Sequence, residues 1–126
     1  MMNVLLIEDD LDVAETIQSV LTNFFGKVEV CHVVDGDGFR KGQWRNKEWS
    51  LVILDLMMPG MTGFEVCERL RGYGPTSKVP ILALTGYDRL QNEEKIKAAG
   101  ASGYMAKPFE VMKLKSEIER LMKKAA

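Results

Sequence analysis

The chain has 126 residues, which is enough for one domain with its own hydrophobic core. With 46% hydrophobic and 28% charged residues it has the composition of an ordinary globular protein, and its net charge of -1 argues against a nucleic-acid-binding surface. No apolar run is long enough to span a membrane, and the short apolar start, followed by acids, does not match a signal peptide. Two cysteines without metal-binding spacing are typical of a reducing compartment, so we expect a cytoplasmic protein.

Short apolar runs at regular intervals predict the strands of a sheet. Three of these runs are continuous and suit strands buried on both faces, namely residues 4–7, 51–54 and 81–84. Two weaker candidates are residues 28–32 and 103–106. In the first of these, apolar and polar residues alternate, which indicates a more exposed strand at the edge of the sheet.

Segments with helical periodicity lie between and after these strands. Clear apolar stripes run over residues 13–24 and 111–122, and shorter helices are expected at 64–71 and 89–99. The segment 36–48 has the poorest pattern, because Gly38 and Gly42 each cost about 1 kcal/mol inside a helix. We still expect a helix there, with Trp44 and Trp49 as packing residues.

Strand and helix therefore alternate five times along the chain. This alternation predicts an α/β fold with a five-stranded parallel sheet, doubly wound as (βα)5, with helices on both faces. In such sheets ligands bind beyond the carboxyl ends of the strands. The residues that follow the strands are therefore the first place to look for function.

Polar residues follow four of the predicted strands. They are Glu8, Asp9 and Asp10 after the first, Asp55 after the third, Thr85 and Gly86 after the fourth, and Lys107 and Pro108 after the fifth. Taken singly, each group has an ordinary interpretation as a helix cap, a turn or a surface residue. Together, these interpretations require four independent coincidences at one sheet edge, and they leave clustered carboxylates repelling one another without benefit.

The same residues suit phosphoryl chemistry. Carboxylates are the hard oxygen ligands that Mg²⁺ prefers, and a carboxylate beside a bound cation can attack a phosphoryl group. Asp55 could act as this nucleophile and form an acyl phosphate. Lys107 could balance the charge and Thr85 could donate a hydrogen bond, which is the positioning and charge stabilisation that phosphoryl transfer requires.

With these residues located, the chain resembles the receiver domains of two-component response regulators over essentially its whole length. The motifs that carry the resemblance are "VLLIEDD", "LVILDLMMPGMTGFEV", "VPILALTG" and "YMAKPF", in the family's order and spacing. The resemblance implies a flavodoxin-like three-layer α/β/α fold and a single receiver domain over residues 1–126. It also implies a phosphorelay switch that assists its own Mg²⁺-dependent phosphorylation and dephosphorylation, rather than an enzyme.

The resemblance implies a role for each of the acids. Asp55 corresponds to the phosphorylated aspartate of the family, and Glu8 and Asp9 correspond to the acidic pair that holds Mg²⁺ together with it. Met57 would add its backbone carbonyl as a further ligand. Glu8 stands where many family members have Asp, but its longer side chain still reaches a metal at this site.

The resemblance also implies a set of switch residues. Thr85 and Lys107 would contact the phosphoryl group, and a cis peptide bond would precede Pro108. Tyr104 occupies the position of the aromatic ring that turns inward when Thr85 moves, although a half-buried core tyrosine is the ordinary alternative. Tyr87, two residues after Thr85, is expected to influence the dephosphorylation rate.

Other classes of protein fit the motifs less well. A phosphatase of the haloacid dehalogenase type would need a second acid where the chain has Met57. A flavin-binding protein would need a loop rich in Ser, Thr and Gly after the first strand, where the chain has acids, and residues 35–38 lack the later acids of an EF-hand loop. The remaining alternative is a degenerate receiver that acts only as a protein-binding module.

The resemblance implies partners as well. A sensor histidine kinase or a phosphotransfer protein would supply the phosphoryl group. In the family, the surface formed by the fourth helix, the fifth strand and the last helix binds an output domain or protein, or a second receiver as a dimer. We expect neither nucleic acid nor membrane among the partners of this chain, which is either a stand-alone receiver or one domain of a larger regulator.

Overall fold

A five-stranded parallel sheet forms the centre of the computed structural model, which describes residues 1–86 and 89–125, with only the backbone for residues 89–92. Its strands are β1 (Met2–Ile7), β2 (Val28–Val33), β3 (Leu51–Asp55), β6 (Ile81–Thr85) and β7 (Gly103–Ala106). They lie in the order β2-β1-β3-β6-β7, and every neighbouring pair is parallel. The predicted sheet is therefore confirmed, with β2 at one edge.

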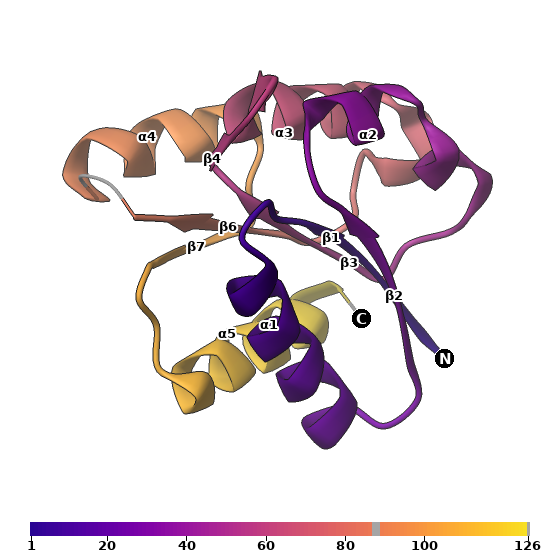
Figure 1. The fold of residues 1–126 in the computed structure, drawn as a ribbon, viewed down its shortest axis with the longest axis vertical. Coiled ribbons are helices and arrows are strands. Elements are labelled where there is room, and N and C mark those ends of the chain that lie inside the picture. Colours follow the sequence, from indigo (N-terminus) through magenta and orange to yellow (C-terminus); the bar gives the residue numbers. More distant parts are fainter. Residues whose placement is uncertain (87–88, 126) are drawn as a thin grey trace.

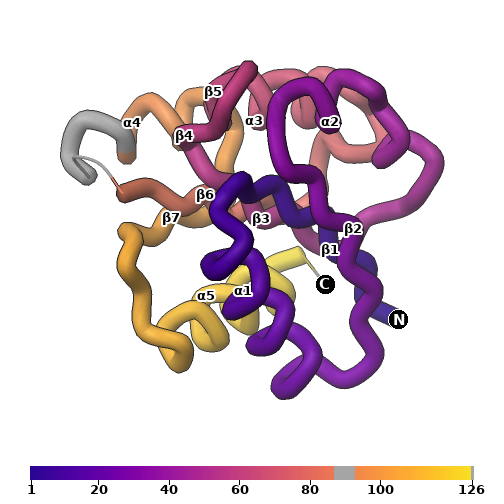
Figure 2. Tube along the Cα trace, in the orientation of Figure 1, coloured from indigo at the N-terminus to yellow at the C-terminus, as the bar shows by residue number. Residues whose placement is uncertain are grey.

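Helices cover both faces of this sheet. They are α1 (Leu11–Phe24), α2 (Gly36–Arg40), α3 (Gly63–Gly72), α4 (Arg89–Ala99) and α5 (Val111–Ala125). Figure 1 shows α1 and α5 on one face and α2, α3 and α4 on the other, which gives the expected three layers. Figure 2 traces the chain in the same orientation, as it leaves β1 for α1 on one face and β2 for α2 on the other. In the part of the chain that the structure describes, no helix has the length and apolar character needed to cross a membrane.

The core consists of two apolar layers, one on each face of the sheet. Successive residues of β1 show the arrangement, since Leu5 and Ile7 pack toward α2, α3 and α4, whereas Val4 and Leu6 pack toward α1 and α5. All four side chains are fully buried. The continuous apolar runs of the sequence are thus strands buried on both faces, as expected for a parallel sheet. The edge strand β2 is mostly half-buried, in agreement with its alternating sequence.

The expectation of one helix over residues 36–48 is only partly correct. The helix α2 ends after 5 residues, and a separate 3₁₀ turn, η1 (Gln43–Asn46), follows. Gly42 separates the two elements with φ at 73°, a left-handed conformation that favours glycine and ends helices. The indole nitrogen of Trp44 donates to the carbonyl of Phe39 at 2.9 Å, and that of Trp49 donates to the carbonyl of Trp44 at 2.8 Å. Both tryptophans are buried, which confirms them as packing residues.

Candidate functional site

The candidate site lies where the winding of the sheet reverses. β1 lies between β2 and β3 in the sheet. The chain first adds β2 on one side of β1 and then returns to add β3, β6 and β7 on the other side. Ligands of doubly wound sheets bind at this switch point, beyond the carboxyl ends of the strands. The register aligns Ile7 with Leu54 and Thr85 with Ala106, so that four strands end at the same edge. The polar residues that follow them are therefore brought together.

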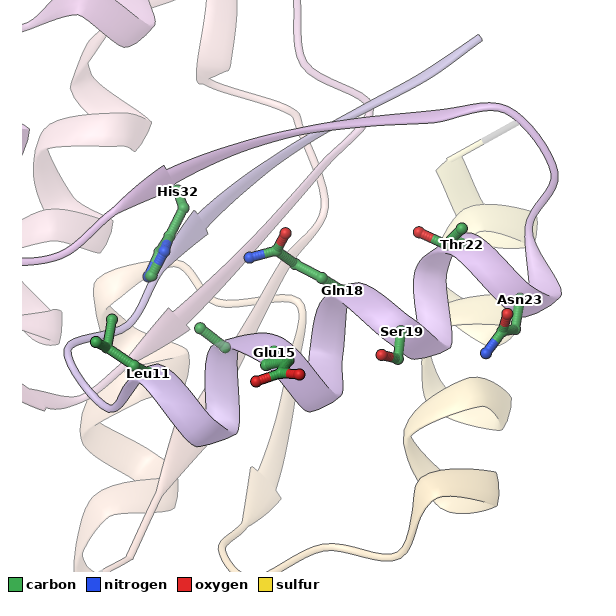
Figure 3. A pocket seen from close by; sticks show the side chains of 8 residues that line it. Leu11, Glu15, Gln18, Ser19, Thr22, Asn23 and His32 are labelled. Carbon is green, nitrogen blue, oxygen red and sulfur yellow. The ribbon is translucent and has the colours of Figure 1, made fainter.

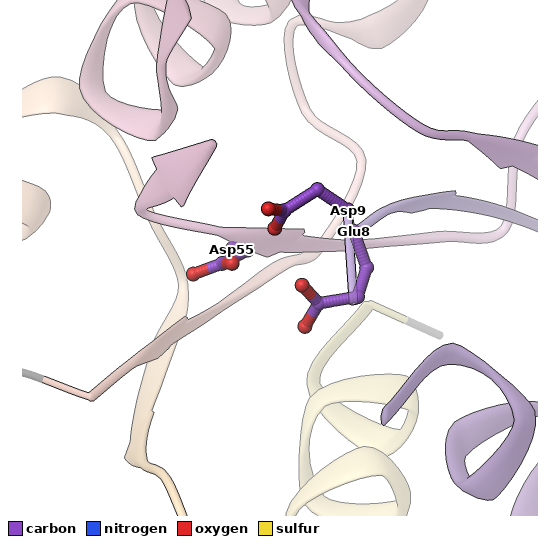
Figure 4. A group of neighbouring side chains, drawn as sticks. All are labelled: Glu8, Asp9 and Asp55. Atoms are coloured by element: carbon purple, nitrogen blue, oxygen red, sulfur yellow. The ribbon is translucent and has the colours of Figure 1, made fainter. Parts of the chain in front are cut away.

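Three carboxylates converge at this edge. Glu8, Asp9 and Asp55 each offer an oxygen, and these oxygens all lie within 4.8 Å of one another. Figure 4 shows the three side chains directed toward one space beyond the ends of β1 and β3. Glu8 is completely buried, Asp55 is 4% exposed and Asp9 is half-buried. Because buried like charges repel strongly, such a cluster requires a compensating positive charge.

Lys107 supplies part of this charge from the end of β7. Its ammonium nitrogen lies 2.6 Å from Glu8 Oε1 and 3.1 Å from Asp55 Oδ2. The backbone amide of Lys107 donates to the carbonyl of Thr85 at 2.7 Å, which extends the pairing of β6 and β7 by one residue. The peptide bond between Lys107 and Pro108 is cis. The end of the strand thus holds the lysine against both acids.

The electrostatics of the cluster favour the binding of a cation. Burial, together with a hydrogen bond with Asp55, raises the pKa of Glu8 to about 7, although Lys107 offsets part of the effect. Burial by itself would lower the pKa of Lys107, but the contacts with Glu8 and Asp55 outweigh burial, and the pKa is raised. One ammonium group therefore faces three carboxyl groups, and the site has an excess of negative charge.

The donor set fits Mg²⁺. All three side-chain donors are carboxylate oxygens, the hard ligands that this ion prefers. Glu8 Oε1 is buried and accepts no hydrogen bond of regular geometry in the described part of the chain, although the Lys107 ammonium lies beside it. A divalent cation between the acids would relieve both their mutual repulsion and this deficit.

The loop after Asp55 brings the backbone close to the site. The amide of Met57 donates to Asp55 Oδ1 at 3.1 Å, and Met57 as a whole residue is 50% exposed. The short strands β4 (Met57–Met58) and β5 (Met61–Thr62) then form an antiparallel hairpin that leads directly into α3. A Cβ atom on Gly63 would lie 2.6 Å from the Asp55 carbonyl oxygen, so only glycine allows α3 to begin against this backbone.

The residues expected to act as a switch lie on the neighbouring strands. Thr85 is fully buried at the end of β6. Tyr104 on β7 pairs with Ala83, is half-buried and packs against the apolar cluster on the side of α2, α3 and α4. Tyr87, which we expected to influence dephosphorylation, lies outside the described residues.

One contact in the site was not expected from the sequence. His32 Nε2 lies 2.7 Å from the backbone carbonyl oxygen of Glu8. His32 is the chain's single histidine and stands near the end of β2, where it pairs with Leu6, two residues before the first acid. No local pattern in the sequence indicated that its ring would reach the Glu8 carbonyl, because this contact depends on the direction of the side chain in the folded structure.

The whole arrangement has counterparts among known proteins. The family model of the response regulator receiver domain matches residues 4–119. The response regulator RppA of Synechocystis sp. is 33% identical over 127 residues, which covers 98% of this chain and 52% of RppA. The chain thus spans about half the length of this curated relative.

Two solved structures share the fold over nearly their full lengths. The signal receiver domain of a DNA-binding response regulator from Colwellia psychrerythraea is 28% identical with a TM-score of 0.87, and the match covers 98% of this chain and 99% of that one. The receiver domain of a sensor histidine kinase from Pseudomonas aeruginosa is 27% identical with a TM-score of 0.83, over 97% and 98% of the two chains. The latter structure has a magnesium ion coordinated in its active site cleft.

Proposed function

The chain belongs to the family of response regulator receiver domains, and we propose that Asp55 is the residue that accepts the phosphoryl group. The domain is a phosphoacceptor switch of two-component signalling. Receiver domains of this family interact with histidine kinases or phosphotransfer proteins. In our proposal residues 1–126 act as a single receiver domain. We also infer a cytoplasmic location, which the free thiols of Cys31 and Cys67 support.

The observation that carries the proposal is the position of Asp55 beside both the other acids and Lys107. Its carboxylate ends a central strand, shares a site with Glu8 and Asp9, and lies 3.1 Å from the lysine ammonium. A carboxylate oxygen of Asp55 attacks the phosphorus of a phosphohistidine on the partner, and an oxygen–phosphorus bond forms as the nitrogen–phosphorus bond breaks. The electron pair of the broken bond stays on the partner's imidazole, which takes up a proton from solvent.

The other groups of the site prepare Asp55 for this step. Glu8, Asp9, Asp55 and the backbone carbonyl of Met57 would hold Mg²⁺, which, when bound, supplies positive charge beside the phosphoryl oxygens. Lys107 contacts Asp55 Oδ2 and is placed to pair with a phosphoryl oxygen after the transfer. In this way the chain assists its own phosphorylation.

Phosphorylation then shifts the domain between two states. The hydroxyl of Thr85 moves to donate a hydrogen bond to the phosphoryl group, and Tyr104 turns into the space that Thr85 leaves. The surface of α4, β7 and α5 changes shape and binds an output domain or protein, or a second receiver. The size of this shift is limited by the difference in stabilisation that the phosphoryl group gives to the two states.

A degenerate receiver that only binds proteins is a poorer explanation of the site. Such a domain has no need for a buried nucleophile, a paired lysine and a strand-end hydroxyl at one edge. Here Asp55, Lys107 and Thr85 occupy adjacent strand ends, with two further acids beside them.

The proposal is tested by intact mass after incubation with acetyl phosphate, with and without Mg²⁺. We expect a single Mg²⁺-dependent phosphoryl adduct in the wild type and none in Asp55→Asn. Asp12→Asn is the matched control, because it removes the same charge from an exposed position in the first turn of α1 and should keep the adduct. An equal yield of adduct in Asp55→Asn would overturn the assignment. A wild type that forms no adduct and binds no beryllofluoride would favour the binding-only receiver.

A further inference from the structure

The side chain of His32 reaches across from β2 to the backbone of the acidic site. Its Nε2 atom lies 2.7 Å from the carbonyl oxygen of Glu8. Figure 3 shows the ring directed from β2 toward the turn that joins β1 to α1, near Leu11. A carbonyl oxygen only accepts hydrogen bonds, so the proton of this hydrogen bond must be carried by Nε2.

The contact occurs where two parallel strands separate. The amide of Glu8 still donates to the carbonyl of Val33 at 3.0 Å, as in a regular ladder. β2 ends at Val33 and the chain turns toward α2, where Asp35 caps the helix through a hydrogen bond from the Gly38 amide at 2.8 Å. The His32 ring therefore donates to the Glu8 carbonyl at the point where β2 has ended. A buried backbone carbonyl requires such a donor.

The Glu8 carbonyl belongs to the peptide unit that leads into Asp9. Because a peptide unit is planar, a hydrogen bond that holds this carbonyl also fixes the direction in which the chain enters Asp9. At the end of the turn, the amide of Asp10 donates to Glu8 Oε2 at 3.3 Å. The Asp10 carboxylate caps α1 by accepting hydrogen bonds from the amides of Asp12 and Val13. The turn that carries both acids is thus held at its start by His32 and at its end by the helix cap.

We propose that His32 is a positioning residue for the metal site. By donating to the Glu8 carbonyl, it keeps the Glu8–Asp9 peptide in the orientation from which both carboxylates face Asp55. This inference rests on the proposed function, because it assumes that these three acids bind Mg²⁺. His32 itself does not contact the cation, and its effect is on the affinity with which the acids bind it.

The first experiment compares His32→Phe with His32→Gln by calorimetric titration with Mg²⁺. Phe keeps an aromatic ring but has no donor, and we expect it to weaken the Mg²⁺ affinity about tenfold, as loss of a partner that orients metal ligands does. The amide nitrogen of Gln is as many bonds from the backbone as His Nε2, and it should restore most of the affinity. Wild-type affinity in His32→Phe, or equal weakening in both variants, would overturn the proposal. Thermal unfolding without Mg²⁺ verifies that both variants are folded.

Asp9→Asn separates this inference from the proposed function. If the wild type binds Mg²⁺ and Asp9→Asn does not, the metal site stands, and the His32 variants then test the positioning role alone. A wild type without measurable Mg²⁺ affinity would overturn both.

A second measurement needs no variant. Nitrogen NMR of the His32 ring, at a pH where the ring is neutral, should show the proton on Nε2. A proton on Nδ1 instead would overturn the proposal even if the variants fail to fold.

Discussion

At the scale of single residues, the site is organised around the contacts of Lys107. Its ammonium lies between Glu8 and Asp55, at 2.6 Å and 3.1 Å from one oxygen of each. Removing one partner of a buried ion pair leaves an uncompensated charge, so this lysine stabilises the arrangement of the acids in addition to the chemical role that we propose for it. Glu8 makes the shorter of the two contacts.

Thr85→Ala should separate phosphorylation from switching. Asp55, the proposed nucleophile, and the other acids remain, so we expect the phosphoryl adduct to form, whereas the hydroxyl that would donate a hydrogen bond to it is lost. The ring of Tyr104 should then keep its resting NMR shifts when beryllofluoride is added. Thr85→Ser retains the hydroxyl and should respond like the wild type. If the Tyr104 shifts still change on addition of beryllofluoride to Thr85→Ala, the proposed coupling between Thr85 and Tyr104 is contradicted.

The two cysteines should differ in reactivity. Burial raises the pKa of the Cys67 thiol to about 11, despite the opposing effect of Arg71, so the thiol stays protonated at neutral pH. Cys31 is half-buried on the edge strand. Labelling of the native protein with a thiol reagent should therefore show one slow group, Cys67, and one faster group, Cys31. A Cys31→Ser variant identifies them, and rapid labelling that persists in this variant would contradict the prediction.

At the scale of elements, the connection from β3 to α3 determines how the backbone passes Asp55, the proposed nucleophile. It contains a hairpin, the left-handed Gly60 with φ at 85°, and Gly63 as the first residue of the helix. The side chain of Thr62 accepts from the Glu65 amide at 3.2 Å and caps α3. The Pro-Gly and Thr-Gly pairs of this segment thus allow the chain to turn and begin a helix within a few residues of Asp55.

Gly63→Ala should disturb the site through the backbone. The added Cβ would lie 2.6 Å from the Asp55 carbonyl oxygen, and the strain should lower the free energy of unfolding by about 1 to 3 kcal/mol. Phosphorylation by acetyl phosphate should also slow down. Gly72→Ala, at the other end of α3, is the control, because its Cβ would meet nothing within 4 Å and alanine favours the helix. Denaturant unfolding of both variants checks the difference; equal stabilities would contradict it.

The segment 36–48 shows where sequence periodicity is insufficient at this scale. Its glycines already suggested a weak helix, and Gly42 ends it, but the 3₁₀ turn that follows packs into an aromatic cluster that the periodicity does not show. The rings of Phe39 and Trp44 stack at 4.9 Å, and Tyr73, distant in sequence, meets Trp44 edge-on at 5.5 Å. Burial of these rings favours a short helix followed by a 3₁₀ turn over one continuous helix.

At the scale of the whole molecule, Arg71 joins three segments on one face. From α3, its guanidinium donates to the carbonyl of Gly100 at 2.8 Å, to that of Thr76 at 3.0 Å and to the Ser102 hydroxyl at 3.2 Å. The Ser102 hydroxyl in turn accepts from the Ile81 amide at 3.1 Å. The end of α4 is thereby fixed to α3 and to the start of β6.

Arg71→Met should destabilise the fold without altering the acidic site. Met keeps the apolar part of the side chain but leaves three acceptors without their charged donor, and we expect a loss of about 2 kcal/mol in the free energy of unfolding. The Mg²⁺ affinity should be unchanged, because the contacts of Arg71 do not include the three acids. Arg71→Lys, with one donor group in place of the planar fork, should recover only part of the stability. Wild-type stability in Arg71→Met would contradict this role.

The alternation of strands and helices, the parallel sheet and the acids at its edge could be predicted from the sequence, apart from the extent of the helix at 36–48. These features depend on local periodicity and on residues that directly follow apolar runs, and both can be read along the chain. Contacts between distant segments became visible only in the folded molecule: Lys107 against Glu8, His32 on the Glu8 carbonyl, and Arg71 on Gly100. They depend on strand register and side-chain reach, which arise only when distant segments pack together, and so no local pattern encodes them.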